Sequence, residues 1–317
     1  DSDWTKGAGT TISNNKLNIN FSGAGNTAYQ SLSLGSGIIN KVVVVCSSYT
    51  SGSVDIRVGS NAASSIVNSV GTFTFYIKED GYPYINFFTG SGFVGSIDNV
   101  SVKEVGQDWE FTDGATITSN GVRIVSDGTY QRVKQDNVLT VGKQYKIQYE
   151  IVEKNSGNLK LANSFGLLTI PTTVGVHTVY GEALLTFLGF ERSGACDITL
   201  TNVSVKEVGQ HWTFGTGWSM GSDLALYTGT TNASLSQPNK LISGRTYKLQ
   251  YEVISSSIDG NFKISGVTES AQSSLSKTVG THNINFIADG SAPTSMDLRV
   301  VSNTTGTLEI DNIVVQE

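Results

Sequence analysis

The sequence is poor in charge, in proline and in cysteine. Charged residues make up 15% of its 317 residues, against about 25% in an average soluble protein. The 21 Lys and Arg and the 27 Asp and Glu are spread without a basic cluster, which argues against a nucleic-acid partner. Apolar runs such as residues 42–46 are far shorter than the ~20 residues that cross a bilayer. We therefore expect no membrane insertion.

The scarcity of cysteine also limits what the sequence says about redox chemistry. Cys46 and Cys196 lie at non-equivalent places of the chain, so we expect two buried thiols rather than a disulfide. Two cysteines form no framework that indicates a compartment.

Glycine, by contrast, is abundant, with 35 residues among many Ser, Thr and Asn. This composition is typical of an all-β protein with many turns. Windows of ten or more residues show no apolar spacing of three and four, so essentially no helix is predicted.

An internal repeat organises the chain. The block NVSVKEVGQ begins at Asn99 and again at Asn202, and a degenerate copy begins at Asn312. A tryptophan followed by a Gly-rich turn opens each unit, and a Val-Gly pair marks its later part. Repeats with a constant phase indicate repeated structural modules. We predict three of them: residues 1–107, 108–210 and 211–317.

Within each unit, apolar and polar residues alternate as in half-buried strands. Tyr145, Ile147 and Tyr149 alternate with Lys146 and Gln148. About eight short strands fit into ~100 residues, which suits two antiparallel sheets in jelly-roll order. The predicted fold is all-β, with three tandem β-sandwich (jelly-roll) modules. Because the linkers are only two residues long, at residues 106–107 and 209–210, we expect a semi-rigid rod.

The closing strand of each unit shows the same alternation. In the first unit it places Val100 and Val102 on the core face, and Ile97 on the opposite face.

These motifs resemble a known class of jelly roll. An opening Trp, a central G-K-x-Y-K-x-x-Y strand, a Val-Gly-Thr strand and a closing I-D-N-V-S-V-K-E-V are similar to the carbohydrate-binding-module-like sandwiches (family 4 and 9 type) repeated in bacteriophage tail fibres and capsid fibres. The resemblance covers all three units. The first unit lacks the central Tyr pair, and the second has Thr201 in place of the closing Asp.

The resemblance implies a structural or adhesion protein at the virion surface, outside the cell. Other virion proteins and host surface glycans would be its partners. Asp1 stands where a module begins, so we also expect an earlier part of a longer chain before it.

Signatures of catalysis are absent from the sequence. No zinc, phosphate-loop or nucleophile-elbow motif occurs. His177 and His282 are equivalent positions of two units, and Glu79 and Asp80 are adjacent rather than opposed. We therefore expect no enzyme, and no cofactor apart from a structural calcium ion.

Sugar-binding sandwiches stack sugar rings on exposed aromatic side chains. Tyr82 and Tyr84 share one face of a strand, and Trp218 has no partner in the other units. These three are the candidate carbohydrate-binding residues. A place in the core explains all three as well, and we favour that interpretation.

The resemblance further implies a calcium site between the first and the closing strand. Asp98 and Asp311 are its candidate ligands, although a solvated strand-end Asp is the explanation we favour. Trp4, Trp109 and Trp212 recur at the module boundaries, which predicts that each packs against the preceding module.

The function favoured by the sequence is a fibre or decoration segment of a virion. Two others stay open: a carbohydrate-binding array of a secreted polysaccharide-degrading enzyme, and a subunit of a bacterial surface filament. Weakly charged Ser, Thr, Gly and aliphatic surfaces suit contacts between identical chains. We expect self-association, with a homotrimer favoured.

Overall fold

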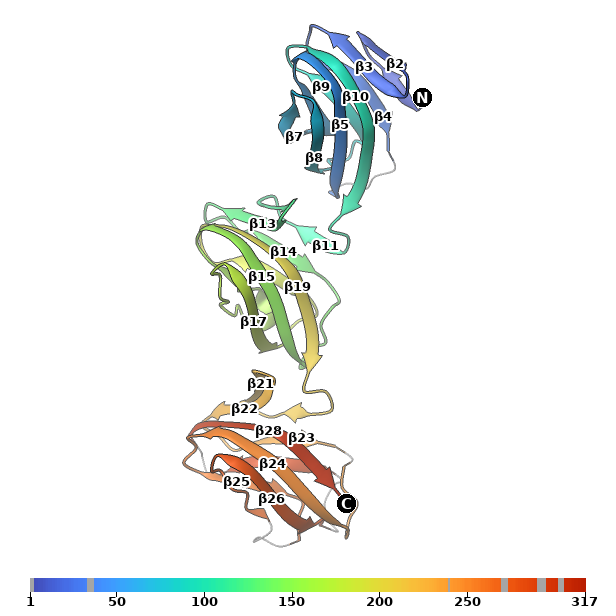
Figure 1. The fold of residues 1–317 in the computed structure, drawn as a ribbon. Helices are drawn as coiled ribbons and strands as arrows, with labels where there is room; N and C mark the ends of the chain where they lie inside the picture. Colours follow the sequence, from blue (N-terminus) through green and yellow to red (C-terminus); the bar gives the residue numbers. More distant parts are fainter. Residues whose placement is uncertain (1–2, 33–36, 239, 269–272, 290–294, 302–304) are drawn as a thin grey trace.

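The computed structural model of the chain describes residues 3–32, 37–238, 240–268, 273–289, 295–301 and 305–317. Six antiparallel sheets pair into three β-sandwiches that follow one another along the chain (Figure 1). Helical structure is scarce: η1 (Asn163–Phe165) is a single 3₁₀ turn. Within the described residues no helix is long and apolar enough to cross a membrane. The all-β fold predicted from the sequence is confirmed.

The first sandwich is a jelly roll. Its strands are β1 (Trp4–Lys6), β2 (Thr10–Ser13), β3 (Lys16–Phe21), β4 (Gly25–Ser31), β5 (Ile39–Gly52), β6 (Val54–Val58), β7 (Asn61–Val67), β8 (Gly71–Lys78), β9 (Tyr84–Thr89) and β10 (Phe93–Val105). The sheet orders are β1-β4-β9-β6-β7 and β2-β3-β10-β5-β8. From β3 to β10 the chain therefore passes between the sheets in the order of an eight-stranded jelly roll.

The second sandwich repeats this order. Its strands are β11 (Trp109–Phe111), β12 (Ala115–Thr118), β13 (Gly121–Ser126), β14 (Arg132–Gln135), β15 (Gln144–Ser156), β16 (Leu159–Leu161), β17 (Gly175–Glu182), β18 (Leu188–Arg192) and β19 (Cys196–Val208). They form the sheets β11-β14-β18-β16 and β12-β13-β19-β15-β17. The turn η1 lies in the stretch that corresponds to β7.

The third sandwich has the topology of the second. Its strands are β20 (Thr213–Phe214), β21 (Trp218–Gly221), β22 (Leu224–Gly229), β23 (Ala233–Gln237), β24 (Thr246–Ser256), β25 (Asn261–Ser265), β26 (Gly280–Ile287), β27 (Met296–Val301) and β28 (Gly306–Gln316). The sheets are β20-β23-β27-β25 and β21-β22-β28-β24-β26. The closing strands β10, β19 and β28 thus take the same central place in their sheets.

Each sandwich encloses its own apolar core. In β15 the predicted alternation is confirmed, because Tyr145, Ile147 and Tyr149 are all buried. The buried Tyr149 hydroxyl donates to the Pro171 carbonyl at 2.7 Å. In the third sandwich the equivalent Tyr251 is also buried, and burial raises its pKa to about 12. These hydroxyls are thus neutral and hydrogen-bonded, as buried polar groups must be.

The closing strands do not keep one alternation throughout, which corrects the expectation from the sequence. Ile97, Val100 and Val102 all face the core of the first sandwich, although Ile97 was predicted on the opposite face. Between them Asn99 has φ 42°, and the pairing of β10 with β5 shifts register between Asp98 and Ser101. This β-bulge reverses which face of the strand points inward.

The same bulge occurs in the other two sandwiches. Asn202 has φ 50° and Asn312 has φ 49°, and register shifts accompany both. Asparagine enters this left-handed region more readily than most residues. The repeated Asn of the NVSV block is therefore explained by backbone geometry.

The sandwiches meet at two joints of the same design. At the first joint, β8 lies beside β12, and Lys78 Nζ is 3.5 Å from Asp113 Oδ1. At the second joint, the equivalent strand β17 lies beside β21, which is equivalent to β12. There Lys146 Nζ is 2.5 Å from Asp223 Oδ2. Figure 1 shows the resulting extended array, with the two chain ends in its outer sandwiches.

A glycine is required where the long central strand turns into the next strand. Gly157 follows β15 with φ 69°, and a Cβ atom there would lie 2.1 Å from the backbone oxygen of Ala195. Gly142 has a similar φ of 80°, but a Cβ atom there would meet nothing within 4 Å. The two positions share the backbone strain and differ in the available space.

We expect Gly142→Ala to lower the free energy of unfolding by about 1 to 2 kcal/mol, because only the left-handed backbone is strained. Gly157→Ala should cost on the order of 1 to 3 kcal/mol more, because the methyl group collides with backbone. Urea unfolding of the intact chain measures both. Equal losses for the two variants would contradict the packing at Gly157.

Candidate functional site

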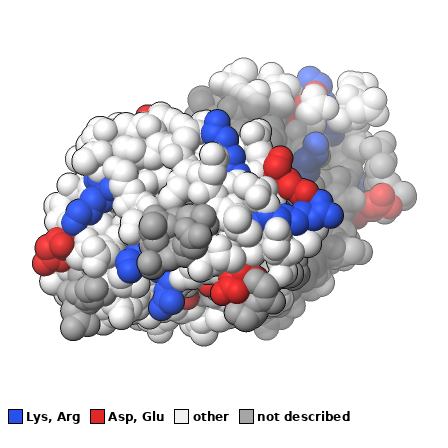
Figure 2. Space-filling model, turned by 90° about the horizontal axis from the view of Figure 1, so that it is seen from below, with Lys and Arg blue, Asp and Glu red and all other residues white. Residues whose placement is uncertain are grey.

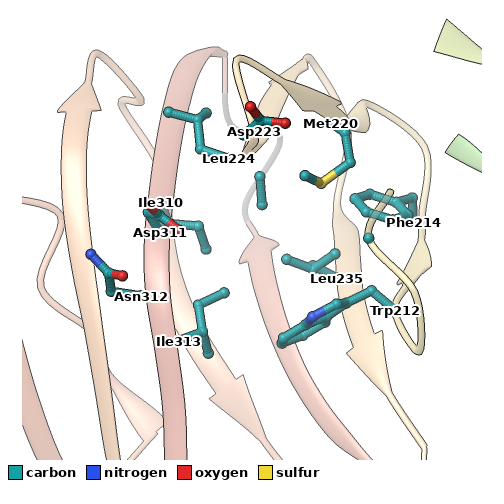
Figure 3. A pocket seen from close by; sticks show the side chains of 12 residues that line it. Trp212, Phe214, Met220, Asp223, Leu224, Leu235, Ile310, Asp311, Asn312 and Ile313 are labelled. Carbon is teal, nitrogen blue, oxygen red and sulfur yellow. The ribbon is translucent and has the colours of Figure 1, made fainter. Parts of the chain in front are cut away.

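A pocket beside the opening tryptophan is present in each sandwich. In the third sandwich it has a volume of about 270 Å³. Figure 3 shows its side chains, which come from β20, β21, β22, β23 and β28 and from the turns next to them. The apolar lining includes Trp212, Phe214, Met220, Leu224, Leu235, Ile310 and Ile313, and the polar side chains are Asp223, Asp311 and Asn312.

The other two pockets are equivalent. The one in the first sandwich, of about 150 Å³, includes Trp4, Asp98 and Asn99. The one in the second, of about 270 Å³, includes Trp109 and Asn202. All three volumes are below the 300–1,000 Å³ or so of typical ligand sites. We interpret the three pockets as gaps between the two sheets of each sandwich, next to the bulge of the closing strand.

The bulge asparagines are held by hydrogen bonds in two of the pockets. Asn202 Nδ2 donates to Glu150 Oε2 at 2.7 Å, and Asn312 Nδ2 donates to Glu252 Oε2 at 2.8 Å. In the first sandwich Val45 stands where these glutamates stand. In the second and third sandwiches the asparagines thus tie the bulge to the neighbouring strand.

The opening tryptophans pack against the cores of their own sandwiches. Trp4 lies with its ring centroid 5.5 Å from that of Phe87, and Trp109 and Trp212 contact the second and third cores. Trp109 also lines a groove of about 410 Å³ together with Ile38 of the first sandwich. Packing against the preceding module stays a prediction for all three tryptophans, and the contacts described above lie within their own modules.

The two predicted calcium ligands lie in different sandwiches. Asp98 Oδ2 lies 3.9 Å from the ammonium group of Lys16. Asp311 lines the pocket of the third sandwich, where Asp223 already pairs with Lys146. Within the described ranges, no group of three or more His, Cys, Asp and Glu side chains is arranged to hold a metal ion. These residues do not fit the six to eight oxygen ligands of calcium.

The candidate sugar-binding residues lie in different environments. Tyr82 is 58% exposed and Tyr84 is half-buried, with their ring centroids 6.4 Å apart. Trp218 is only 3% exposed and packs against Tyr227 in the third core, with ring centroids 5.5 Å apart. Neither face of its ring is free to stack on a sugar. The prediction of Trp218 as a sugar-binding residue is therefore wrong, and Trp218 is a core residue.

Tyr82 and Tyr84 belong to a larger aromatic surface that includes Tyr29, a residue that the sequence analysis missed. Tyr29 is 40% exposed, and its ring centroid is 6.3 Å from that of Tyr84. The signal was present in the sequence, since Tyr29 follows the inward-facing Ala28 in a strand. Its proximity to Tyr84 depends on the pairing of β4 with β9.

Polar groups continue this surface across the sheet. Tyr29, Asn86 and Arg57 lie opposite one another in register on β4, β9 and β6, and therefore on one face. Asn86 Nδ2 donates to the Gly59 carbonyl at 3.1 Å, while Oδ1 has no hydrogen-bond partner among the described residues. The Arg57 guanidinium lies 3.7 Å from the centroid of the Phe88 ring. We call Tyr29, Tyr82, Tyr84 and Arg57 the tyrosine surface, and Asn86 is buried on the same face of the sheet.

The histidines have structural surroundings. His177 lies against Tyr149 with ring centroids 5.5 Å apart, and His282 lies against Tyr251 at 5.3 Å. Each Nε2 atom is within hydrogen-bond distance of a threonine carbonyl four residues earlier. The equivalent positions predicted for these two residues thus have equivalent contacts. Cys46 and Cys196 are buried free thiols, and burial raises the pKa of both.

Comparison with known proteins gives structural similarity only. No protein-family model matches the chain, and no curated protein matches it. The chain is similar to a protein in the atomic structure of Sulfolobus Turreted Icosahedral Virus, with 12% identity, a TM-score of 0.25, and coverage of 97% of this chain and 90% of that one. It is also similar to a protein described with the triple jelly roll fold and turret assembly of an archaeal virus, with 10% identity, a TM-score of 0.25, and coverage of 97% and 89%. At these values the similarity carries no argument about function.

We expect Trp212→Ala to lower the free energy of unfolding of the third sandwich by about 2 kcal/mol, because the ring is only partly buried. Trp218→Ala should cost about 3 to 5 kcal/mol, as for a fully buried aromatic ring. Hydrogen exchange of β24 and β28 peptides in the intact chain measures both effects. A larger loss for Trp212→Ala than for Trp218→Ala would contradict the packing described above.

Proposed function

We propose that this chain is a non-enzymatic structural and adhesive segment of a virion surface, either a fibre or a capsid decoration. Its modules would be residues 1–107, 108–210 and 211–317. The observation that carries the proposal is the repeated joint, in which β8 meets β12 and β17 meets β21. One joint design used twice extends an array in a constant way, as in other repeat proteins. Such an array suits a spacer that holds its outer module away from a particle.

The short linkers support the same function. Gly106 and Gly209 have φ 71° and 64°, and the backbone turns there before the next tryptophan. Trp109 N–H donates to the Gly106 carbonyl at 3.1 Å, and Trp212 N–H donates to the Gly209 carbonyl at 3.0 Å. In each linker a backbone hydrogen bond holds the turn, and an ion pair joins the two modules nearby. Neighbouring modules therefore have little freedom to rotate relative to each other.

The adhesive part of the proposal rests on the tyrosine surface. Exposed tyrosine rings offer flat apolar faces to sugars. This surface favours surface glycans as the partner. The same observation favours the second candidate function, a carbohydrate-binding array of a secreted polysaccharide-degrading enzyme. A bacterial surface filament and a lateral homotrimer remain further proposals.

Antibodies raised against the chain distinguish these functions. Gold labelling of intact virions from the source is the expected result. Labelling confined to secreted enzyme fractions would favour the second candidate, and labelling of cell-surface filaments would favour the third.

Joint rigidity gives a prediction for the isolated chain. Asp223→Lys places two cations at the second joint, because Lys146 loses its partner. We expect a broader distribution of particle lengths in small-angle X-ray scattering than for the unmodified chain. Asp136→Lys is the matched control, since Asp136 pairs with Lys134 inside the second sandwich. A control that broadens the distribution equally would count against the joint.

The tyrosine surface gives a separate prediction. If a glycan array identifies a ligand, Tyr82→Ala and Tyr84→Ala should each weaken its binding about tenfold, because loss of one stacking ring removes on the order of 1 kcal/mol or more. Tyr130→Ala is the control, since Tyr130 is a similarly exposed tyrosine of the second sandwich. Binding that survives both substitutions would place the ligand elsewhere.

A further inference from the structure

An exposed valine stands at the same place in each sandwich. Val70, Val174 and Val279 immediately precede the strands β8, β17 and β26, and each is followed by a glycine. They are 63%, 67% and 70% exposed, which makes each the most exposed large apolar side chain described in its sandwich. A single exposed valine is normal on a protein surface, but three at equivalent places form a repeated feature. We call these three residues the edge valines.

The middle sandwich shows that neighbouring sandwiches do not cover this place. It contacts the first sandwich through β12, which is the opposite edge of the sheet that ends in β17. It contacts the third sandwich near Tyr180, which lies opposite the ion-paired Lys146 and is about 20 Å further along the extended strand than Val174. A further sandwich joined in the same way would therefore leave the edge valines exposed.

The loop that carries Val174 is tied down on its inner side. The Tyr149 hydroxyl donates to the Pro171 carbonyl at 2.7 Å, and His177 Nε2 lies within hydrogen-bond distance of the Thr173 carbonyl. Both contacts come from neighbouring strands of one sheet, β15 and β17. They hold the backbone just before Val174, so the valine is presented in a fixed position.

The third sandwich repeats both contacts. The Tyr251 hydroxyl donates to the Ser276 carbonyl at 2.9 Å, and His282 Nε2 is 2.7 Å from the Thr278 carbonyl. Val279 is therefore presented in the same way as the valine of the second sandwich. A surface that is already ordered loses less conformational freedom when a partner binds, so these loops suit a binding contact.

Apolar side chains enlarge the surface around two of the edge valines. Val152 lies opposite Val174, one position beyond the last pair of β15 with β17, and Val176 on the same strand is 61% exposed. In the third sandwich Ile254 lies opposite Val279 in the same way and is 41% exposed. Most of the third sandwich that Figure 2 shows from below is uncharged, with scattered basic and acidic side chains. A contact at such surfaces desolvates little charge.

The spacing of the edge valines indicates the partner. Because one joint design is used twice, an edge valine recurs once in each sandwich, and β8, β17 and β26 lie toward one side of the array (Figure 1). A partner that contacts all three valines must repeat with the same spacing. A second copy of this chain has that spacing.

We propose that copies of this chain associate side by side in the same direction, with each edge valine packed against the equivalent valine of a neighbouring copy. Each contact is small, but the three form together because the sandwiches are joined, and linked contacts reinforce one another. Closed symmetry about an axis along the array limits the number of copies. The inference rests on the proposed function and deepens it, because copies anchored to one particle point in the same direction. It gives the proposed lateral homotrimer its contact surface.

Sedimentation of the full chain from micromolar to millimolar concentration measures the association. We expect the mass to reach a plateau at a small whole multiple of the chain mass, three for the homotrimer. Val174→Asp should weaken association on the order of tenfold, because the contact would then bury a charge. Combining it with Val70→Asp and Val279→Asp should leave a monomer.

Val125→Asp is the matched control for these substitutions. Val125 is 41% exposed and lies on β13, near the opposite edge of the sheet that ends in β17. It should leave association unchanged, and thermal melting checks that each variant is folded. A chain that stays monomeric at millimolar concentration would overturn the inference, and so would association that all three edge substitutions leave unchanged.

Chemical cross-linking tests the direction of the copies. Val70→Cys and Val279→Cys should each be cross-linked to themselves by a short bismaleimide, since equivalent valines meet when the copies are parallel. The native thiols of Cys46 and Cys196 are buried and should not react. Cross-links that form only when the two variants are mixed would show antiparallel copies and overturn the inference. None of these outcomes would change the virion labelling that tests the proposed function, so the two failures are distinguishable.

Discussion

The bulge in the closing strand is the constraint on which the rest of each sandwich depends. Before the bulge, Ile198 and Leu200 face the second core, and after it Val203 and Val205 do so. Without Asn202 in the left-handed region, one of these two pairs would point to solvent. The bulge therefore lets a single long strand contribute to the core along its whole length. It also leaves the gap beside the opening tryptophan, which explains why equivalent pockets recur.

The joints follow from the same architecture. The hairpin that packs beside the closing strand in one sandwich projects toward the preceding one, where β8 or β17 forms the edge of a sheet. An edge strand has unpaired backbone groups that must be covered or protected. In this chain the next sandwich lies beside that edge twice. The ion pairs differ between the joints, so the backbone arrangement is conserved between them while the side chains vary.

The first sandwich differs from the other two in the features that concern recognition. One of its sheets has a fifth strand, β7, where the corresponding sheets of the other sandwiches have four strands. The tyrosine surface lies on the outer face of this five-stranded sheet. The central tyrosines of the other sandwiches are replaced by the buried Asn40 and Val44. The module that departs most from the repeat is thus the one in which exposed tyrosine rings lie next to one another, whereas Tyr149 and Tyr251 are buried. Sequence divergence and surface chemistry coincide in this module.

The sequence by itself determined the fold class, since a period of two and a repeated block leave few alternatives to tandem sandwiches. It also offered Tyr82 and Tyr84 as candidate sugar-binding residues, although alternation favoured a place in the core for both. It did not separate Tyr82 from Trp218, since an aromatic residue that begins a strand has the same pattern inside or outside a core. Tyr29, Asn86 and Arg57 were brought together only by strand pairing, which joins residues far apart in the chain. The face of Ile97 depended on a bulge, and the two joints depended on contacts between strands of neighbouring modules. Both features depend on contacts between segments that are far apart in the sequence, and local periodicity does not predict such contacts.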